Sequence, residues 1–214
     1  MAFWVTKFAD NISKDFVDLL SHPEDIVKQG EIIKDDKSTT VVRFQWQGKF
    51  YILKRFNARN KGHAIKRSLR KTRARNCWQM SHIFPRHGVS VAEPVAMLEK
   101  RVGFLKADSY FISAQIEGHE LLHWLPNQTK AIQASTEQQV RNMFAVFAKN
   151  RLSHGDMKAT NLLWFDHKVV VIDLDAAKQH VNNVLFARAH ARDKRRFSRN
   201  GQLFANMLSI SAYA

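Results

Sequence analysis

The spacing of apolar residues along the chain alternates between helical and strand-like periods. Residues 11–20 place Ile12, Phe16 and Leu20 at helical intervals, which predicts an amphipathic helix that ends at Pro23. Three short runs rich in β-branched and aromatic residues follow and predict strands at 31–34, 40–44 and 50–54. A second helix is predicted at 73–86.

The pattern changes again in the remainder of the chain. Strands are predicted at 95–99, 104–107 and 110–114, followed by helices at 119–124 and 136–149. The second of these helices carries Val140, Phe144 and Phe147 on one stripe, which is typical of a helix packed on a core. An apolar run that ends at Asp173 predicts a buried strand, and helices are expected after Asp175 and at 203–214.

Charge is the unusual feature of the composition. The net charge of +15 favours an anionic partner, such as nucleic acid, a membrane surface or a phosphorylated substrate. The single cysteine, Cys77, excludes an internal disulfide and a cysteine-based metal site. Charged residues interrupt every apolar run short of a membrane span, and the first residues lack the pattern of a signal peptide. We therefore expect a cytoplasmic protein.

Ten Lys or Arg residues and no acid lie between Lys54 and Arg75. A solvated helix face is the ordinary explanation of a charge run, but so one-sided a run repels itself and indicates an anionic partner. Aromatic residues that would stack on single strands are sparse here, which makes nucleic acid an unlikely partner. A phosphorylated lipid or sugar, or an anionic leaflet, fits the run. The helix expected after Asp175 is also basic, with Asp193 as its one acid among Arg188 to Arg199.

Two motifs carry the chemistry. His154, Asp156 and Asn161 follow the H-x-D-x-x-x-x-N pattern of a kinase catalytic loop, and Asp173 ends the apolar run that comes next. Phosphoryl transfer needs a carboxylate beside the acceptor hydroxyl and oxygen ligands for magnesium on the nucleotide. We assign Asp156 as the candidate base, and Asn161 and Asp173 as candidate Mg²⁺ ligands. An ordinary turn would explain the motif at 154–161, and an ordinary strand end would explain Asp173. The occurrence of both, in this order, favours a kinase.

The first half supplies candidate nucleotide contacts. Lys54 closes the third predicted strand, where a kinase lysine pairs with phosphates, although an edge-strand lysine in solvent would look the same. The first turn contains no glycine, so donors from Ser38 and Thr39 are the candidates to cover the phosphates. Backbone groups of 115–117 (Gln115, Ile116 and Glu117) are expected to meet the adenine edge.

One element of a kinase is missing. The predicted helix at 73–86 has Asn76, Cys77 and Gln79 where a kinase carries the Glu that pairs with the strand lysine. Glu93 or Glu99 could take its place, Lys54 could be held without an ion pair, or the active geometry could be lost.

Several segments together resemble the bacterial lipopolysaccharide core kinase family, which contains the heptose and Kdo kinases. The segments are 50–56, 73–78, 87–89, 154–161 and 172–175. The resemblance implies an α+β, two-lobed, protein-kinase-like fold. Its expected parts are a small antiparallel β-sheet N-lobe at 1–114 with an N-terminal helix and one further helix, a hinge at 115–118, and a mainly helical C-lobe with the catalytic loop at 119–214.

The resemblance also implies a function. The expected activity is ATP-dependent phosphorylation of a heptose or Kdo hydroxyl of the lipopolysaccharide inner core, at the cytoplasmic face of the inner membrane, with Mg²⁺. Asp156 then acts as the base, Lys158 lies near the transferred phosphate, and the partner is an anionic glycolipid or phosphorylated sugar. Three alternative functions stay open: a kinase for a protein or small-molecule acceptor, a pseudokinase binding module, and a nucleic-acid binder.

Overall fold

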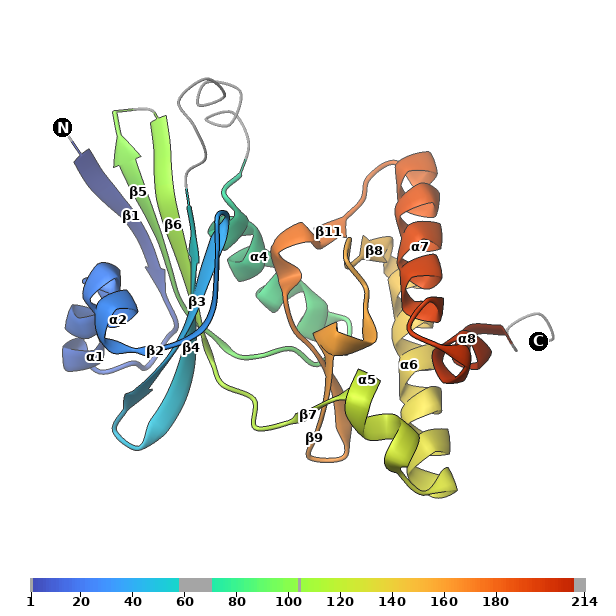
Figure 1. Ribbon diagram of the computed structural model, residues 1–214. Helices are drawn as coiled ribbons and strands as arrows, with labels where there is room; N and C mark the ends of the chain where they lie inside the picture. Colours follow the sequence, from blue (N-terminus) through green and yellow to red (C-terminus); the bar gives the residue numbers. More distant parts are fainter. Residues whose placement is uncertain (1, 58–70, 104, 210–214) are drawn as a thin grey trace. The chain divides into compact units, whose positions relative to one another are not determined.

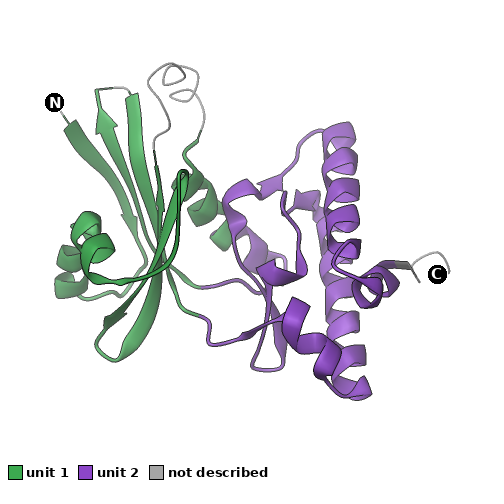
Figure 2. Cartoon of the chain, in the orientation of Figure 1, with its two compact units in different colours: residues 1–81, 93–115 green, residues 82–92, 116–214 purple. Residues whose placement is uncertain are grey.

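The computed structural model describes residues 2–57, 71–103 and 105–209 (Figure 1). The chain divides into two compact units, of which unit 1 contains 1–81 and 93–115, and unit 2 contains 82–92 and 116–214 (Figure 2). Half of the basic run that was predicted to contact an anionic partner lies outside the described residues: Arg59, Lys61, Lys66, Arg67 and Arg70. Within the described part of the chain, no helix is both long enough and apolar enough to cross a membrane.

Unit 1 is built on an antiparallel sheet. Its described strands follow the order β1-β5-β6-β4-β3-β2. Their bounds are β1 (Ala2–Phe8), β2 (Glu31–Asp36), β3 (Thr39–Trp46), β4 (Lys49–Phe56), β5 (Pro94–Val102) and β6 (Leu105–Ala114). The strands predicted at 31–34, 40–44 and 50–54 are confirmed, while β1 was not predicted because most of this edge strand is exposed and shows no apolar alternation.

Helices cover both faces of this sheet. On one face, α1 (Lys14–Leu20) and α2 (Pro23–Gln29) bury Phe16, Leu20 and Ile26 against Leu53 and Ile112. The Ser13 hydroxyl caps α1 by accepting the amide of Phe16 at 3.2 Å. Pro23, predicted to end a helix, also begins α2, since proline fits the first helical turn.

The other face of the sheet carries α4 (Arg73–Arg86), which confirms the helix predicted there. Ala74, Cys77 and Trp78 of this helix form a buried cluster with Phe56, Met97 and Phe111 of the strands. Side chains of directly paired residues share a face of a sheet. Lys54 pairs with Phe111, and Phe111 with Met97, so Lys54 lies on the face that α4 covers.

The prediction of two separate strands at 104–107 and 110–114 was wrong. β6 is one strand that pairs with β5 along its length and with β4 from Ser109 to Ala114. Pairing with β5 at Lys106 and Ser109 holds the polar stretch 106–109 extended, although its sequence shows no strand period, and β4 joins at Ser109.

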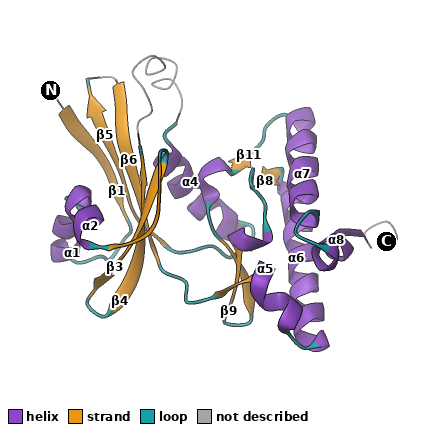
Figure 3. Cartoon of the chain, in the orientation of Figure 1, coloured by secondary structure: helices purple, strands orange, loops and turns teal. Residues whose placement is uncertain are grey.

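Unit 2 is mainly helical, with short strands (Figure 3). Its helices are α5 (Leu121–Trp124), η2 (Leu125–Asn127), α6 (Lys130–Asn150), η3 (Ala159–Asn161), η4 (Leu174–Ala176), α7 (Asn183–Ser198) and α8 (Gln202–Ser209). Its strands are β7 (His119–Glu120), β8 (Leu152–Ser153), β9 (Leu162–Phe165), β10 (Lys168–Val171) and β11 (Lys178–Gln179). α6 begins six residues before the predicted helix because Thr129 caps it, and Val140, Phe144 and Phe147 are buried as expected.

The segment 82–92 belongs to unit 2, whereas the sequence analysis placed it in the N-lobe. Phe84 packs on Phe147 with 5.2 Å between ring centroids. The carbonyl oxygen of Ser90 accepts the amide of Val171 at 2.8 Å. These contacts join the segment to α6 and β10, and their partners lie too far along the chain to be visible in local sequence patterns.

Candidate active site

The predicted catalytic loop, 154–161, follows β8 and is hydrogen-bonded to α7. Both oxygens of the Asp193 carboxylate, on α7, accept backbone amides of the loop: His154 N at 2.7 Å and Gly155 N at 3.0 Å. Asp193 is fully buried, so these charge-assisted bonds replace its hydration. Asp193, the one acid among Arg188 to Arg199, thus supports the loop from within the core.

His154 fixes the next part of the loop. Its imidazole is fully buried. Nε2 lies 2.9 Å from the carbonyl oxygen of Ile172, and Nδ1 accepts the amide of Asp156 at 3.3 Å. The tautomer with its proton on Nε2 satisfies both bonds. His154 thus ties the backbone of the candidate base to the segment that carries Asp173.

Gly155 is required by backbone geometry. Its φ of +86° lies in a region that residues with a side chain rarely adopt. A Cβ atom at this position would lie 2.5 Å from the carbonyl oxygen of Ala176. Glycine therefore allows the loop to pass close to η4.

The carboxylate of Asp156 is oriented by two cations. Arg196 of α7 places Nη1 2.7 Å from Oδ1, and Lys158 places Nζ 3.0 Å from Oδ2. The same Arg196 nitrogen donates to the carbonyl oxygen of Gly155 at 2.7 Å. The Asp156 side chain is 33% exposed, so a hydroxyl group can still reach it. A carboxylate has about four lone-pair positions, which leaves acceptor capacity beyond these two cations.

A β-hairpin brings the candidate metal ligands together. β9 and β10 pair antiparallel, with Leu162 opposite Val171, so the residues just outside this pair are neighbours. Accordingly, the amide of Ile172 donates to the backbone oxygen of Asn161 at 3.0 Å. The next residue, Asp173, has a left-handed backbone (φ 62°, ψ 57°).

The donor set suits Mg²⁺. The side-chain amide nitrogen of Asn161 donates to the backbone oxygen of Asp156 at 2.8 Å, so the remaining polar atom of that side chain is its carbonyl oxygen. That oxygen and the Asp173 carboxylate are two hard oxygen ligands, and magnesium completes its shell with water and phosphate oxygens. Among the described residues there is no cluster of three or more His, Cys, Asp or Glu side chains for a metal.

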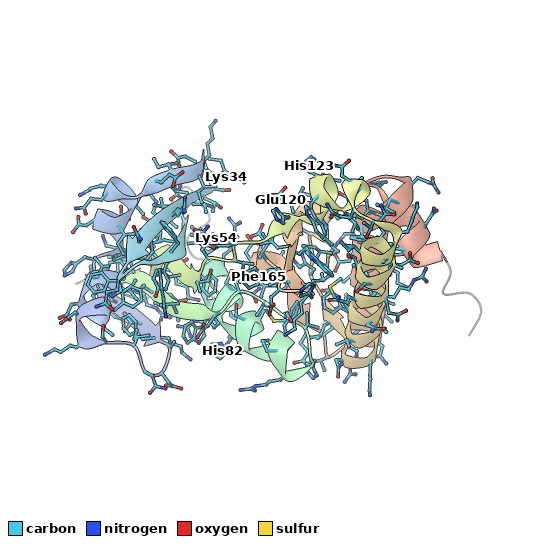
Figure 4. The ribbon with its side chains drawn as sticks, turned by 90° about the horizontal axis from the view of Figure 1, so that it is seen from below. Lys34, Lys54, His82, Glu120, His123 and Phe165 are labelled. Carbon is cyan, nitrogen blue, oxygen red and sulfur yellow. The ribbon has the colours of Figure 1, made fainter. Side chains whose placement is uncertain are left out.

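The candidate residues of unit 1 form a separate group. Lys54 projects from β4 on the α4 face of the sheet (Figure 4). Glu99, on β5, lies on the same face and is fully buried. It accepts hydrogen bonds from Thr72 Oγ1 at 2.5 Å, Arg75 Nη2 at 2.5 Å and Arg101 Nη2 at 2.9 Å. Glu99 therefore anchors the start of α4 to β5 through Thr72 and Arg75.

Burial alone would raise the pKa of the Glu99 carboxyl. The hydrogen bonds from Arg75, Thr72 and Arg101 outweigh this effect, so the pKa lies below its ordinary value. Glu99 is thus an ionised, buried group that takes part in an arginine network.

The turn that was expected to cover the phosphates is organised by an acid. Asp36 Oδ1 accepts the Ser38 amide at 2.7 Å, the Ser38 hydroxyl at 2.7 Å and the Thr39 amide at 2.9 Å. Hydrogen bonds from Ser38 hold the pKa of Asp36 well below its usual range. The Thr39 hydroxyl accepts from Arg73 Nη1 at 2.9 Å. The donors predicted to face a phosphate thus already have partners within the turn.

The expected adenine-binding segment follows β6. The amide of Gln115 donates to the carbonyl oxygen of Phe50 at 3.0 Å and continues the sheet. Its side-chain oxygen Oε1 is buried and has no hydrogen-bond partner among the described residues. The carbonyl oxygen of Gln115 and the backbone groups of Ile116 and Glu117 remain the candidates for the adenine edge.

Sequence reasoning missed Asp193 and Arg196. Asp193 falls between Ala189 and Phe197 at intervals of four residues, and both neighbours are buried. That spacing would have placed the acid on the core face of the helix. Nothing local singles out Arg196 among the arginines of α7, because its role comes from a contact with residues forty positions earlier.

Comparison with known proteins agrees with this geometry. A search of curated proteins found no match. A solved structure of WaaP in complex with acyl carrier protein matches 95% of this chain and 88% of the WaaP chain, with a TM-score of 0.63 and 16% identity. This similarity shows a shared fold. The family model of the lipopolysaccharide kinase (Kdo/WaaP) family matches residues 21–206. The chain, an ATP-dependent phosphotransferase with a kinase-like fold, therefore belongs to the lipopolysaccharide kinase (Kdo/WaaP) family.

Proposed function

We propose that this kinase transfers the γ-phosphate of ATP to a heptose or Kdo hydroxyl of the lipopolysaccharide inner core. The observation that carries the proposal is the arrangement of the catalytic loop, in which the Asp156 carboxylate is held in one orientation beside Asn161 and remains open to a substrate. Family membership supports the class of acceptor.

The residues of the loop take distinct roles in the transfer. Asp156 accepts the proton of the sugar hydroxyl while the hydroxyl oxygen forms a bond to the γ-phosphorus of ATP. The bond between the γ-phosphorus and the oxygen of the leaving ADP breaks. Lys158, 3.0 Å from Asp156, places a cation beside the point where negative charge moves onto the transferred phosphoryl group. Arg196 orients Asp156 and is a positioning residue.

Further residues are proposed to bind the nucleotide. Asn161 and Asp173 would hold Mg²⁺, which would neutralise charge on the nucleotide phosphates. We propose that Lys54 binds the nucleotide phosphates and that the backbone of 116–117 meets the adenine. For Ser38 and Thr39, a phosphate contact would require exchange of the Asp36 hydrogen bonds.

The net charge of +15 suits an acceptor of this kind. An inner-core glycolipid carries carboxylates and phosphates and lies in an anionic leaflet, where each nearby Lys or Arg contributes about 1 kcal/mol to binding. We propose that the protein works at the cytoplasmic face of the inner membrane.

A labelled-phosphate assay tests the proposal. The purified protein is incubated with ATP labelled at the γ-position, Mg²⁺ and a panel of acceptors: Kdo-terminated and heptose-terminated inner-core glycolipids, a protein mixture and an aminoglycoside. The expected result is Mg²⁺-dependent label on one inner-core sugar, absent with Asp156→Asn. Label that enters only the protein mixture or the aminoglycoside would contradict the proposal.

A further inference from the structure

One face of α7 combines exposed apolar side chains with a row of arginines. Val184 and Leu185 are 60% and 58% exposed, and Val181, just before the helix, is 92% exposed. Arg188, Arg192, Arg195 and Arg199 continue the same side of the helix at intervals of three or four residues, and all four are exposed. We refer to these seven residues as the α7 face.

This composition is costly for a surface that meets only water. Like charges spaced four residues apart on a helix repel each other. Single exposed apolar residues are ordinary, but here three lie together at one end of the basic row. The only acid within α7 is Asp193, which is buried on the opposite side and bonded to the catalytic loop. The α7 face therefore has no acid of its own helix to offset its charge.

The apolar end is held in position by the rest of unit 2. Asn182 caps α7 by accepting the amide of Leu185 at 3.0 Å. Arg151 Nη1 lies 3.4 Å from the carbonyl oxygen of Val181 and 3.3 Å from Asn183 Oδ1, and it adds a further cation beside this end. Val181, Val184 and Leu185 thus project from a well-defined helix start.

We propose that the α7 face docks on an anionic lipid bilayer. A row of cations beside short apolar side chains is the pattern of a helix that lies in the membrane interface, where the arginines meet lipid phosphates and the apolar groups enter the acyl boundary. The row lacks the aromatic side chains that stack on nucleic-acid bases.

This inference rests on the proposed function for its purpose. Asp193, on the buried side of α7, and Arg196, four residues after Arg192 and 39% exposed, both contact the catalytic loop. A helix with its side chains is about 10–12 Å across, so docking through the α7 face would hold the loop near the leaflet that contains a glycolipid acceptor.

Vesicle co-sedimentation of the full chain tests the docking face. Vesicles of phosphatidylethanolamine with one third phosphatidylglycerol are compared with neutral phosphatidylcholine vesicles. The wild type is expected to bind the anionic vesicles, and Arg188→Glu/Arg192→Glu/Arg195→Glu to bind them about 100-fold more weakly, from roughly fivefold per cation. Val184→Asp/Leu185→Asp is expected to weaken binding about tenfold.

Two matched controls lie in unit 1. Lys7→Glu/Lys14→Glu/Lys49→Glu makes the same change in net charge at exposed positions. Ile32→Asp/Ile33→Asp alters two apolar residues of similar exposure, 58% and 55%. Both controls should bind vesicles within about threefold of the wild type, and circular dichroism should show all four variants folded.

Three results would overturn the inference: no binding of the wild type to anionic vesicles, equal losses in the unit 1 controls, or no effect of Val184→Asp/Leu185→Asp. The last would show that the face binds an anionic surface through charge alone and that its apolar side chains do not enter the bilayer. Phosphorylation of a deacylated acceptor in solution separates this inference from the proposed function. The α7 variants should keep that activity, whereas failure of the proposed function would abolish it in the wild type and leave vesicle binding intact.

Discussion

Arg196 and Asp156 are joined by an ion pair in which Nη1 lies 2.7 Å from Oδ1. The same nitrogen donates to the backbone oxygen of Gly155, so one guanidinium fixes both the side chain of the candidate base and the backbone that carries it. The two residues are forty positions apart, and α7 brings them together. The pair accounts for the orientation of the candidate base.

We expect Arg196→Leu to lower kcat about 10- to 100-fold with a deacylated acceptor in solution and to change KM for ATP less than threefold. The loss arises because the carboxylate of Asp156 can then rotate away from the acceptor hydroxyl. Arg196→Lys should recover part of the rate, and Arg195→Leu, one residue away on the exposed side of α7, is the control. A rise in KM with unchanged kcat would show that Arg196 binds substrate instead.

Asp156→Asn should lower kcat about 100- to 10,000-fold, the usual contribution of a general base. The amide keeps the size of the side chain, so thermal unfolding should change by only a few degrees. Single-turnover measurement of phosphate transfer is the direct readout. Activity equal to the wild type would remove Asp156 from the role of base.

Asp193→Asn should destabilise the protein by about 3 kcal/mol. The side-chain NH2 group of Asn would replace a carboxylate oxygen that lies 3.0 Å from the Gly155 amide, so two donors would face each other in a buried site and the charged acceptor would be lost. Urea unfolding followed by circular dichroism measures the change. Asp166→Asn, at an exposed turn position, should stay within about 0.5 kcal/mol. Equal stability of the two variants would contradict the role of Asp193 as the support of the loop.

Gly155→Ala and Gly88→Ala separate backbone strain from crowding. Both glycines have a positive φ, 86° and 79°, so both substitutions carry a strain of about 1 kcal/mol. Only at Gly155 would the new Cβ meet a backbone oxygen at 2.5 Å, whereas nothing lies within 4 Å at Gly88. We expect Gly155→Ala to be the more destabilising by at least about 1 kcal/mol and to reduce activity as well. Equal urea midpoints would show that the loop can shift away from η4.

Glu99 gives a pH dependence of stability whose sign follows from its pKa. The folded-state pKa lies below the ordinary value, so the unfolded state binds the proton more tightly. The stabilisation is therefore fully present above the unfolded pKa of about 4.3 and is lost as pH falls through the folded value. Glu99→Gln should be about 1–3 kcal/mol less stable than the wild type at pH 7, and the difference should shrink below about pH 4. A difference that stays constant from pH 7 to pH 3 would show that Glu99 acts through packing.

The sequence by itself determined most of the candidate site. The spacing of Asp156 and Asn161 reflects a loop in which the side-chain amide of Asn161 donates a hydrogen bond to the backbone oxygen of Asp156. Asp173 follows at its position because the β9–β10 hairpin, four residue pairs long, returns the chain to Asn161. These contacts are local, so the order of residues is enough to reveal them. The strands from 31 to 54 and the helix at 73–86 were predicted for the same reason, since their periods are carried by neighbouring residues.

Only the tertiary structure decided what supports that site. In the sequence, Asp193 is one acid among arginines. Its burial and its hydrogen bonds from the two loop amides depend on where α7 packs. Glu99 similarly became the partner of Thr72 and Arg75 through the approach of α4 to β5. The physical reason is the same in each case: burial and long-range hydrogen bonds give a charged side chain its role, and neither is a property of the residues beside it in the chain.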